Sequence, residues 1–319
     1  MREYTDSVAR VRAKETSLLT RQDIDQLLSA DSYASALRLI RDRGYRSQED
    51  GTAEEIIAAA ERDMWDFMTE LADEDTIQIL RLPIDYHNIK ASVKAVFSNI
   101  DGTDLLLSNG TVDETLIYES VKRREYDDVP PEFAEVCEEA FTMLLRTQDG
   151  QMCDIYVDNA MLHAIEETAN KSGDGFIKRY ADLLCDTANL KIAYRCALSG
   201  RNLSFIENAL YNGGTLNVEE LARAAEGGMS EVYEYVSTTH YGDSVEYMKM
   251  GAAFLEKWCA DEIMRLMDNS RFESFSSAPI IAYYYAKRTE IDAVRLILSG
   301  KLNRLDDNKI RERVPRTYV

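Results

Sequence analysis

The stretches DYHNIKASVKAVFSN, residues 85–99, and DTANLKIAYRCALSG, residues 186–200, decide the fold of this chain. Aligned without gaps they share four residues: Asp85/Asp186, Asn88/Asn189, Lys90/Lys191 and Ser98/Ser199. A third copy, TEIDAVRLILSG, follows at residues 289–300. A segment that recurs about every one hundred residues indicates that one structural unit is built three times. We therefore expect a pseudo-threefold body of three similar domains, at residues 1–104, 105–204 and 205–319.

The expected unit is helical. The chain has only 15 glycines and 5 prolines, and long segments carry apolar residues three and four apart. No run alternates strictly between apolar and polar residues, as a half-buried strand would. The sequence therefore predicts an all-α protein, with helices that include residues 24–28, 34–41, 53–71, 131–145, 155–169, 218–225, 231–236 and 245–267.

Three helix starts follow one pattern, in which a capping side chain precedes an acidic residue by three positions. The three pairs are Thr20/Asp23, Thr111/Glu114 and Asn217/Glu220. We expect the cap to accept a hydrogen bond from the third helical amide in each case. The aspartate at position 23 is expected to be too short to return the second hydrogen bond of a full capping box well.

The recurring segment ends at Ser-Asn or Ser-Gly, and Gly200 and Gly300 are expected to take the left-handed conformation beyond a helix end. Lys94, Arg195 and Arg295 each lie four residues before the closing serine. A cation there interacts favourably with the helix dipole. The same three residues occupy equivalent places, so as a second interpretation they would face a central axis and contact a partner. Both interpretations stay open at this stage.

Composition describes a soluble globular protein, with 319 residues, 45% of them apolar and 29% charged. No apolar stretch approaches the roughly 18 residues that a membrane helix needs. The first residues carry charges where a secretory signal has its apolar core, so cytoplasmic residence is expected. The five cysteines are scattered and never form a Cys-x-x-Cys pair, so we expect them to be reduced and mostly buried.

The chain is strongly acidic, with 57 acidic against 37 basic residues and a net charge of -20. Such a surface repels nucleic acid and anionic lipid, and it is either simply solvated or steers a basic protein partner. Tyrosine is the one unusual excess, with 18 residues. Tyrosines pack in helical cores and also suit protein interfaces, and both roles are expected here.

Catalytic motifs are missing from the sequence. There is no G-x-x-x-x-G-K-[ST] loop to hold nucleotide phosphates. His87, His163 and His240 lie far apart and none has a spacing typical of zinc enzymes. Neighbouring acids on a helix point about 100 degrees apart, so pairs such as Glu54 and Glu55 cannot share one pocket. We expect no catalytic residue, no bound metal and no cofactor.

The N-terminal stretch from Tyr4 to Tyr45 resembles the opening of the C-subunit family of V-type ATP synthases, whose eukaryotic members are called d subunits. The resemblance lies in the Ala-Arg-Val-Arg-Ala run at residues 9–13, in Leu18-Leu19 with the acidic helix start after it, and in the segment from Ala36 to Tyr45. The later NIK and NLK segments and the terminal LxxLSG are also similar to that family. The similarity extends over essentially the whole chain.

The resemblance implies a funnel-shaped, all-helical protein without an active site. Members of the family sit peripherally on the cytoplasmic face of the membrane rotor, between the shaft of the D and F subunits and the proteolipid ring, without inserting into the membrane. This chain would then be a socket that transmits torque for proton or sodium transport. The alternative is a helical adaptor or repeat scaffold unrelated to rotary motors. A helical hydrolase or metal enzyme would need a cluster of histidines and carboxylates, and the sequence indicates none.

Overall fold

The computed structural model describes residues 4–45, 51–270, 273, 276–311 and 313–314, and it is all-α over those residues. This confirms the predicted fold class. The described residues form sixteen α-helices and one 3-10 helix, η1 (Thr103–Leu105). The α-helices are α1 (Thr5–Glu15), α2 (Arg21–Leu28), α3 (Tyr33–Asp42), α4 (Ala53–Leu71), α5 (Glu74–Phe97), α6 (Glu114–Arg123), α7 (Pro131–Thr147), α8 (Gly150–Ser172), α9 (Gly175–Ser199), α10 (Leu203–Ala209), α11 (Val218–Gly227), α12 (Met229–Ser237), α13 (Ser244–Met250), α14 (Ala252–Ser270), α15 (Ala278–Leu302) and α16 (Asp307–Arg311).

Contacts divide the chain into two compact units. Unit 1 combines residues 1–73 with residues 264–319, so the two ends of the chain share one unit. Unit 2 comprises residues 74–263. The division into three domains at residues 1–104, 105–204 and 205–319, and the pseudo-threefold arrangement, stay predictions.

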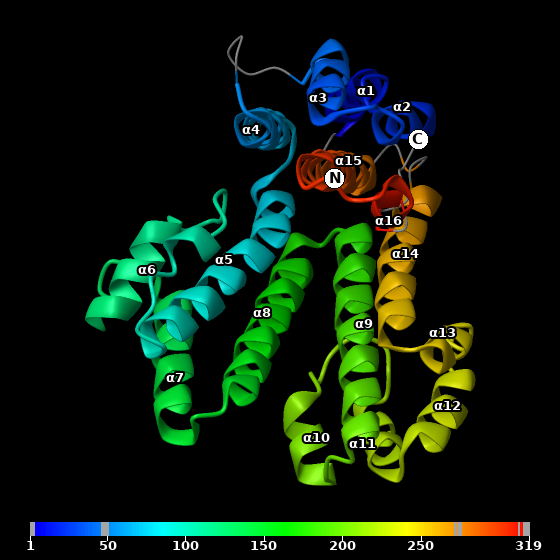
Figure 1. The fold of residues 1–319 in the computed structure, drawn as a ribbon. Helices are drawn as coiled ribbons and strands as arrows, with labels where there is room; N and C mark the ends of the chain where they lie inside the picture. Colours follow the sequence, from blue (N-terminus) through cyan, green and yellow to red (C-terminus); the bar gives the residue numbers. More distant parts are fainter. Residues whose placement is uncertain (1–3, 46–50, 271–272, 274–275, 312, 315–319) are drawn as a thin grey trace. The chain divides into compact units, whose positions relative to one another are not determined.

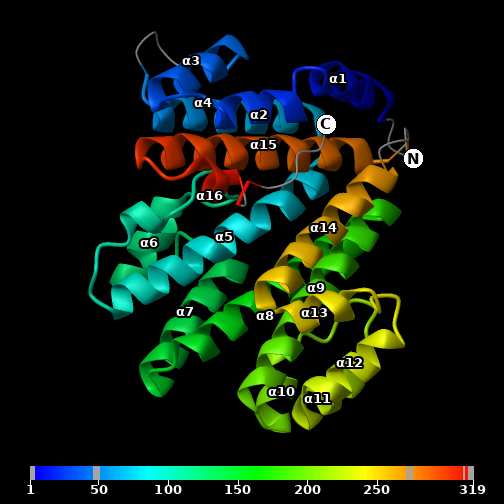
Figure 2. The ribbon, with the colours of Figure 1, turned by 45° about the vertical axis from the view of Figure 1, so that its right-hand side comes forward.

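Unit 1 is built around α15, which packs against α4 and against α1, α2 and α3. Figure 2 shows α4 and α15 lying side by side, with the short N-terminal helices beside them. The helix α15 is buried on several faces, and its Tyr283 and Tyr284 are among the largest fully buried side chains of the molecule. A helix that is apolar nearly all round belongs in a core. For these two tyrosines, the core interpretation is confirmed.

Unit 2 contains three long helices, α5, α8 and α9. The helix α8 packs against both α5 and α9, and it lies between them (Figure 1). The shorter helices α6 and α7 pack on α5, whereas α10, α11 and α12 pack on α9. The helices α5 and α9 therefore each carry a set of shorter ones.

Two of the three predicted helix caps are confirmed. Thr20 caps α2, and Asp23 does return the second hydrogen bond of a full capping box, so the expectation that it is too short is wrong. Asn217 caps α11 by accepting from the amide of Glu220. The Thr111 prediction is wrong, because Asp113 caps α6 instead.

The prediction that a left-handed glycine follows a helix end is confirmed for Gly200 and wrong for Gly300. Gly200 follows α9 with φ of 60°, in the left-handed region, as expected. Gly300 instead lies inside α15, which continues to Leu302. A Cβ on Gly300 would come within 2.6 Å of the Ile310 side chain, so this glycine permits the close approach of α16.

The predicted helix over residues 245–267 is interrupted in the structure. Gly251, with φ of 123°, separates α13 from α14. Only glycine adopts that conformation readily. None of the helices in the described part of the chain is long and apolar enough to cross a membrane.

Candidate functional site

The three equivalent cations each form an ion pair with a carboxylate on another long helix. The pairs are Lys94 of α5 with Asp154 of α8, at 2.6 Å, Arg195 of α9 with Glu256 of α14, at 2.7 Å, and Arg295 of α15 with Glu61 of α4, at 2.5 Å. The side chains of the three cations stay between 43% and 64% exposed. Each ion pair therefore connects two helices. An ion pair between exposed side chains contributes little to stability in water.

The positions of these cations bear on both interpretations, namely interaction with the helix dipole and a common axis that all three face. Arg295 lies seven residues before Leu302, where α15 ends, so dipole capping by Arg295 is wrong. Lys94 does lie in the last turn of α5, whereas the last turn of α9 contains no basic residue, so dipole capping by Arg195 is also wrong. Lys94 and Arg195 belong to unit 2 and line one cavity there, whereas Arg295 belongs to unit 1. A common axis faced by all three stays a prediction.

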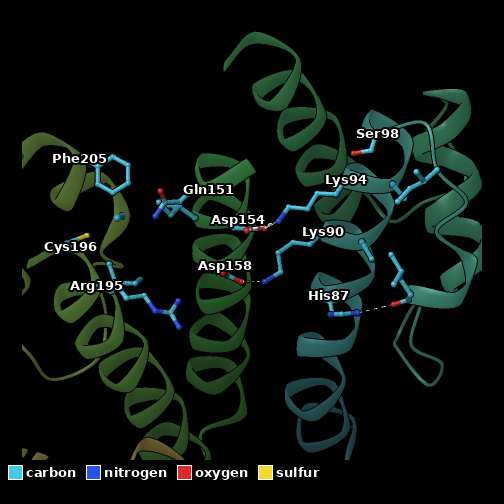
Figure 3. A pocket seen from close by; sticks show the side chains of 17 residues that line it. His87, Lys90, Lys94, Ser98, Gln151, Asp154, Asp158, Arg195, Cys196 and Phe205 are labelled. Atoms are coloured by element: carbon cyan, nitrogen blue, oxygen red, sulfur yellow. Dashed lines mark hydrogen bonds and ion pairs between the residues drawn. The ribbon is translucent and has the colours of Figure 1, made fainter. Parts of the chain in front are cut away.

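That cavity is a trough over α8, with α5 and α9 as its two walls (Figure 3). It has a volume of about 640 Å³. Along α5 the lining residues recur every three or four positions from His87 to Ser98, and along α8 from Gln151 to Asp158. Residues at that spacing lie on one face of a helix, so the trough follows about three turns of α5.

Two ion pairs cross the trough from its α5 wall to its floor. Lys90 reaches Asp158 and Lys94 reaches Asp154, both at 2.6 Å (Figure 3). On the other wall, Arg195 lines the trough and donates to Glu256. A smaller cavity in unit 1, of about 360 Å³, is lined by the corresponding pair of Arg295 and Glu61 together with Ser299.

An apolar loop at the end of α5 forms one edge of the trough. Ile100 and Leu105 line it and are 55% and 51% exposed. The loop is held in place, because the Asn88 side chain donates to the carbonyl of Leu107 and accepts from its amide, both at 2.8 Å. A ring nitrogen of His87 also lies 3.0 Å from the carbonyl oxygen of Leu105.

The asparagine shared by the first two copies of the segment has the same structural role in both. Asn189 of α9, the match of Asn88, donates to the carbonyl of Tyr211 and accepts from its amide, both at 2.9 Å. Tyr211 follows α10, as Leu107 follows η1. Each asparagine thus fixes the loop that lies about twenty residues beyond it in the chain.

The matched aspartates, Asp85 and Asp186, are fully buried and act as clamps. Asp85 accepts hydrogen bonds from the amides of Thr111 and Val112 and from the Thr111 hydroxyl, at 2.7–3.1 Å. Burial raises the pKa of Asp85, and the hydrogen bonds from Thr111 and Val112 oppose that rise. A buried carboxylate with this many donors holds a loop and is not available as a catalytic base.

Asp186 repeats the arrangement on α9. It accepts from the amide of Thr215 at 2.9 Å, from the Thr215 hydroxyl at 2.6 Å, from the amide of Leu216 at 3.1 Å and from the Tyr241 hydroxyl at 2.8 Å. Gly214 permits this approach, because a Cβ there would collide with the Asp186 carboxylate.

In unit 1, the buried Glu290 of α15 has a similar role. Its carboxylate accepts from the Leu19 amide at 2.5 Å, from the Tyr45 hydroxyl at 2.6 Å and from Lys287 at 2.6 Å. Leu19 precedes α2 and Tyr45 follows α3. The pair of short helices α2 and α3 is therefore tied to α15 at both of its ends.

For the described residues, the sequence predicts no bound metal and buried, reduced cysteines. No group of three or more histidines, cysteines or acids there could hold a metal ion. All five cysteines are free and buried, which confirms the prediction of their burial. Burial raises the pKa of Cys137 and of Cys185 to about 12, so their thiolates are disfavoured.

Repetition in the sequence singled out the matched aspartates and asparagines without giving them a role, and it did not reveal Glu290. These buried residues could have been predicted from one signal, a polar residue on the otherwise apolar face of a long helix. Such a residue needs hydrogen-bond partners when it is buried. No sequence signal indicated the trough, because residues of four separate helices, α5, α8, α9 and α10, line it together.

Comparison with known proteins identifies the family. The family model described as ATP synthase (C/AC39) subunit matches residues 7–313. The C subunit of the V-type sodium ATPase of Enterococcus hirae is 19% identical to the chain over 99% of both. The C subunit of the A-type ATP synthase of Methanocaldococcus jannaschii is 20% identical over 95% of the chain and 84% of that protein. That of Thermococcus kodakarensis is 22% identical over 97% and 89%.

The family match covers nearly the whole chain, and the described residues are all-α as the resemblance implied. The chain therefore belongs to the ATP synthase (C/AC39) subunit family and is a non-catalytic subunit of a V- or A-type rotary ATPase.

Proposed function

We propose that this chain is a central-stalk subunit of the rotor, a socket between the shaft of the D and F subunits and the proteolipid ring of the membrane sector. It would lie at the cytoplasmic face of the membrane, without entering it. Rotation of the shaft, driven by ATP hydrolysis, would pass through this subunit to the ring that carries ions. During synthesis the torque would pass the other way.

The observation that carries the proposal is the way in which the long helices are tied to their surroundings. Buried carboxylates on α5, α9 and α15 hold neighbouring segments through several hydrogen bonds each. Ion pairs connect α5 to α8, α9 to α14 and α15 to α4. A part that transmits torque has to resist local deformation, and interlocked helices do so.

The proposal is tested by size-exclusion chromatography with light scattering of the chain, alone and mixed with the D–F pair of the same complex. Co-elution with one copy of each subunit, and capture of the chain by the purified proteolipid ring, are the expected results. If neither the D–F pair nor the ring binds, the rotor proposal fails and the alternative of a helical adaptor gains support.

A further inference from the structure

Two asparagine-glycine pairs occur in the sequence, at Asn109–Gly110 and at Asn212–Gly213. They lie in matched loops, because the first follows Leu107 and the second follows Tyr211, the residues that the two matched asparagines of the long helices hold. Asparagine loses its side-chain amide most readily before glycine, since glycine has no Cβ to hinder its main-chain nitrogen.

The loss of the amide requires only water. In such a pair, the main-chain nitrogen of the glycine bonds to the Cγ of the asparagine, and the proton of the glycine amide leaves with the side-chain nitrogen as ammonia. The product is a succinimide ring. Water then adds to one of the two ring carbonyl carbons and breaks its bond to the glycine nitrogen. Addition at Cγ gives aspartate, and addition at the main-chain carbon gives isoaspartate, whose main chain runs through the side chain.

The two glycine amides differ in their hydrogen bonds. The Gly213 amide donates to the carbonyl of Tyr211 at 3.0 Å, whereas within the described residues the Gly110 amide donates to no acceptor. A carboxylate lies beside each glycine, Asp85 at Gly110 and Glu166 at Gly213, so the electrostatic cost of removing the amide proton is similar. A hydrogen-bonded amide loses its proton more slowly, so the Gly110 nitrogen is the more reactive one.

The surroundings of Asn109 also favour the reaction. Asn109 is partly exposed and has φ of 72°, in the left-handed region that asparagine tolerates. Its side-chain nitrogen donates to the Ser108 hydroxyl at 3.2 Å. This nitrogen is the one that leaves as ammonia, and the hydroxyl can turn to donate a hydrogen bond to it as it departs.

The loop around this pair is fixed on both sides. Asn88 holds Leu107, and Asp85 holds Thr111 through its amide and its hydroxyl. Only three residues separate the two anchored positions. Isoaspartate adds one carbon to the main chain between them, so at least one of the two anchors has to loosen.

We propose that Asn109–Gly110 is a site of spontaneous deamidation, and that the isoaspartate formed there loosens the loop that Asn88 and Asp85 hold. The product also adds a negative charge next to Gly110, which itself lies beside the Asp85 carboxylate, and this repulsion weakens the anchor further. The inference is independent of the proposed function.

The test follows both pairs by peptide mass spectrometry while the full chain is incubated in mildly alkaline buffer. We expect the native chain to lose ammonia at Asn109 about threefold faster than at Asn212, and the chain unfolded in guanidinium chloride to react at similar rates at both. Ser108→Ala should slow the reaction at Asn109 alone. Equal native rates at the two pairs, or a faster reaction at Asn212, would overturn the assignment of the site. An unchanged rate at Asn109 in Ser108→Ala would overturn the role given to the hydroxyl.

Hydrogen exchange at the amides of Leu107 and Thr111 tests the consequence for the loop. In chain enriched in isoaspartate, we expect both amides to exchange faster than in fresh protein. Freshly purified Asn109→Asp is the matched control, because it carries the same charge on a main chain of unchanged length and should lose less protection. Wild-type protection in the isoaspartate chain would overturn the loosening of the loop, and equal losses in both proteins would overturn the argument from main-chain length.

Discussion

Replacement of Asp186 by alanine is expected to destabilise unit 2 strongly. The carboxylate is fully buried and accepts hydrogen bonds from two amides and two hydroxyls. The Thr215 and Tyr241 hydroxyls can turn toward other acceptors, but the amides of Thr215 and Leu216 cannot. At about 1–3 kcal/mol for each buried donor left unpaired, the two amides alone give a loss of about 2–6 kcal/mol.

The isosteric change Asp186→Asn can keep the one oxygen to which both amides donate, and the Thr215 and Tyr241 hydroxyls can turn to accept from its new NH2 group, so a clearly smaller loss than that of Asp186→Ala is expected. Asp182→Ala on the same helix is the matched control. Its partner Lys178 also pairs with Glu166, so the change is expected to cost about 1 kcal/mol or less. Urea unfolding gives the free energies, and hydrogen exchange at the amides of Thr215 and Leu216 reports the loop directly.

The reasoning is refuted if Asp186→Ala costs no more than the control, or if both amides keep their protection from exchange. Either result would mean that the loop is held by its other contacts and that the carboxylate is incidental. An intermediate cost with full loss of protection would support the clamp, because a local opening exposes the amides without unfolding the whole unit.

Four further results are expected. Gly214→Ala, with φ of +81° and a Cβ that would collide with the Asp186 carboxylate, should lower the unfolding midpoint more than Gly173→Ala, with φ of +66° and open space around it. Because the pKa of Asp85 is raised above 3.8 in the folded protein, the stability of the wild-type chain relative to Asp85→Asn should fall as pH rises from about 3.8 through that raised pKa, as urea unfolding at a series of pH values would show. A double-mutant cycle on Lys94 and Asp154 should give a coupling of about 1 kcal/mol or less, because both side chains are exposed. All five cysteines should react slowly with a thiol reagent until the protein is unfolded, as a colorimetric assay would show.

Local signals in the sequence predicted the helices well. The helix over residues 53–71 matches α4 to the residue, because Thr52 and Glu55 form a capping box at its start and the apolar spacing continues to Leu71. The break at Gly251 was missed, since a single glycine is compatible with a helix and the apolar spacing on either side of it does not indicate its φ of 123°. Thr111 failed as a cap because its amide and hydroxyl are engaged by Asp85, 26 residues earlier.

The candidate site depended on contacts over longer distances. Repetition identified Asp85 and Asn88 as special, but their partners lie in loops 19 to 27 residues further along the chain. Residue spacing within one helix does not contain that information. The trough was harder still to predict, because four helices, α5, α8, α9 and α10, line it, and the sequence pattern does not indicate how they pack.

The ion pairs show which parts of the chain supply partners to the three copies of the recurring segment. Lys94 and Arg195 find their carboxylates 60 and 61 residues further along, on α8 and α14. Arg295 instead finds Glu61, 234 residues earlier, on α4. Glu290 likewise takes its partners Leu19 and Tyr45 from the N-terminal segment. The helix α4 thus supplies the carboxylate that pairs with α15, as α8 supplies the one that pairs with α5, so the start of the chain provides the partners of the last copy of the segment.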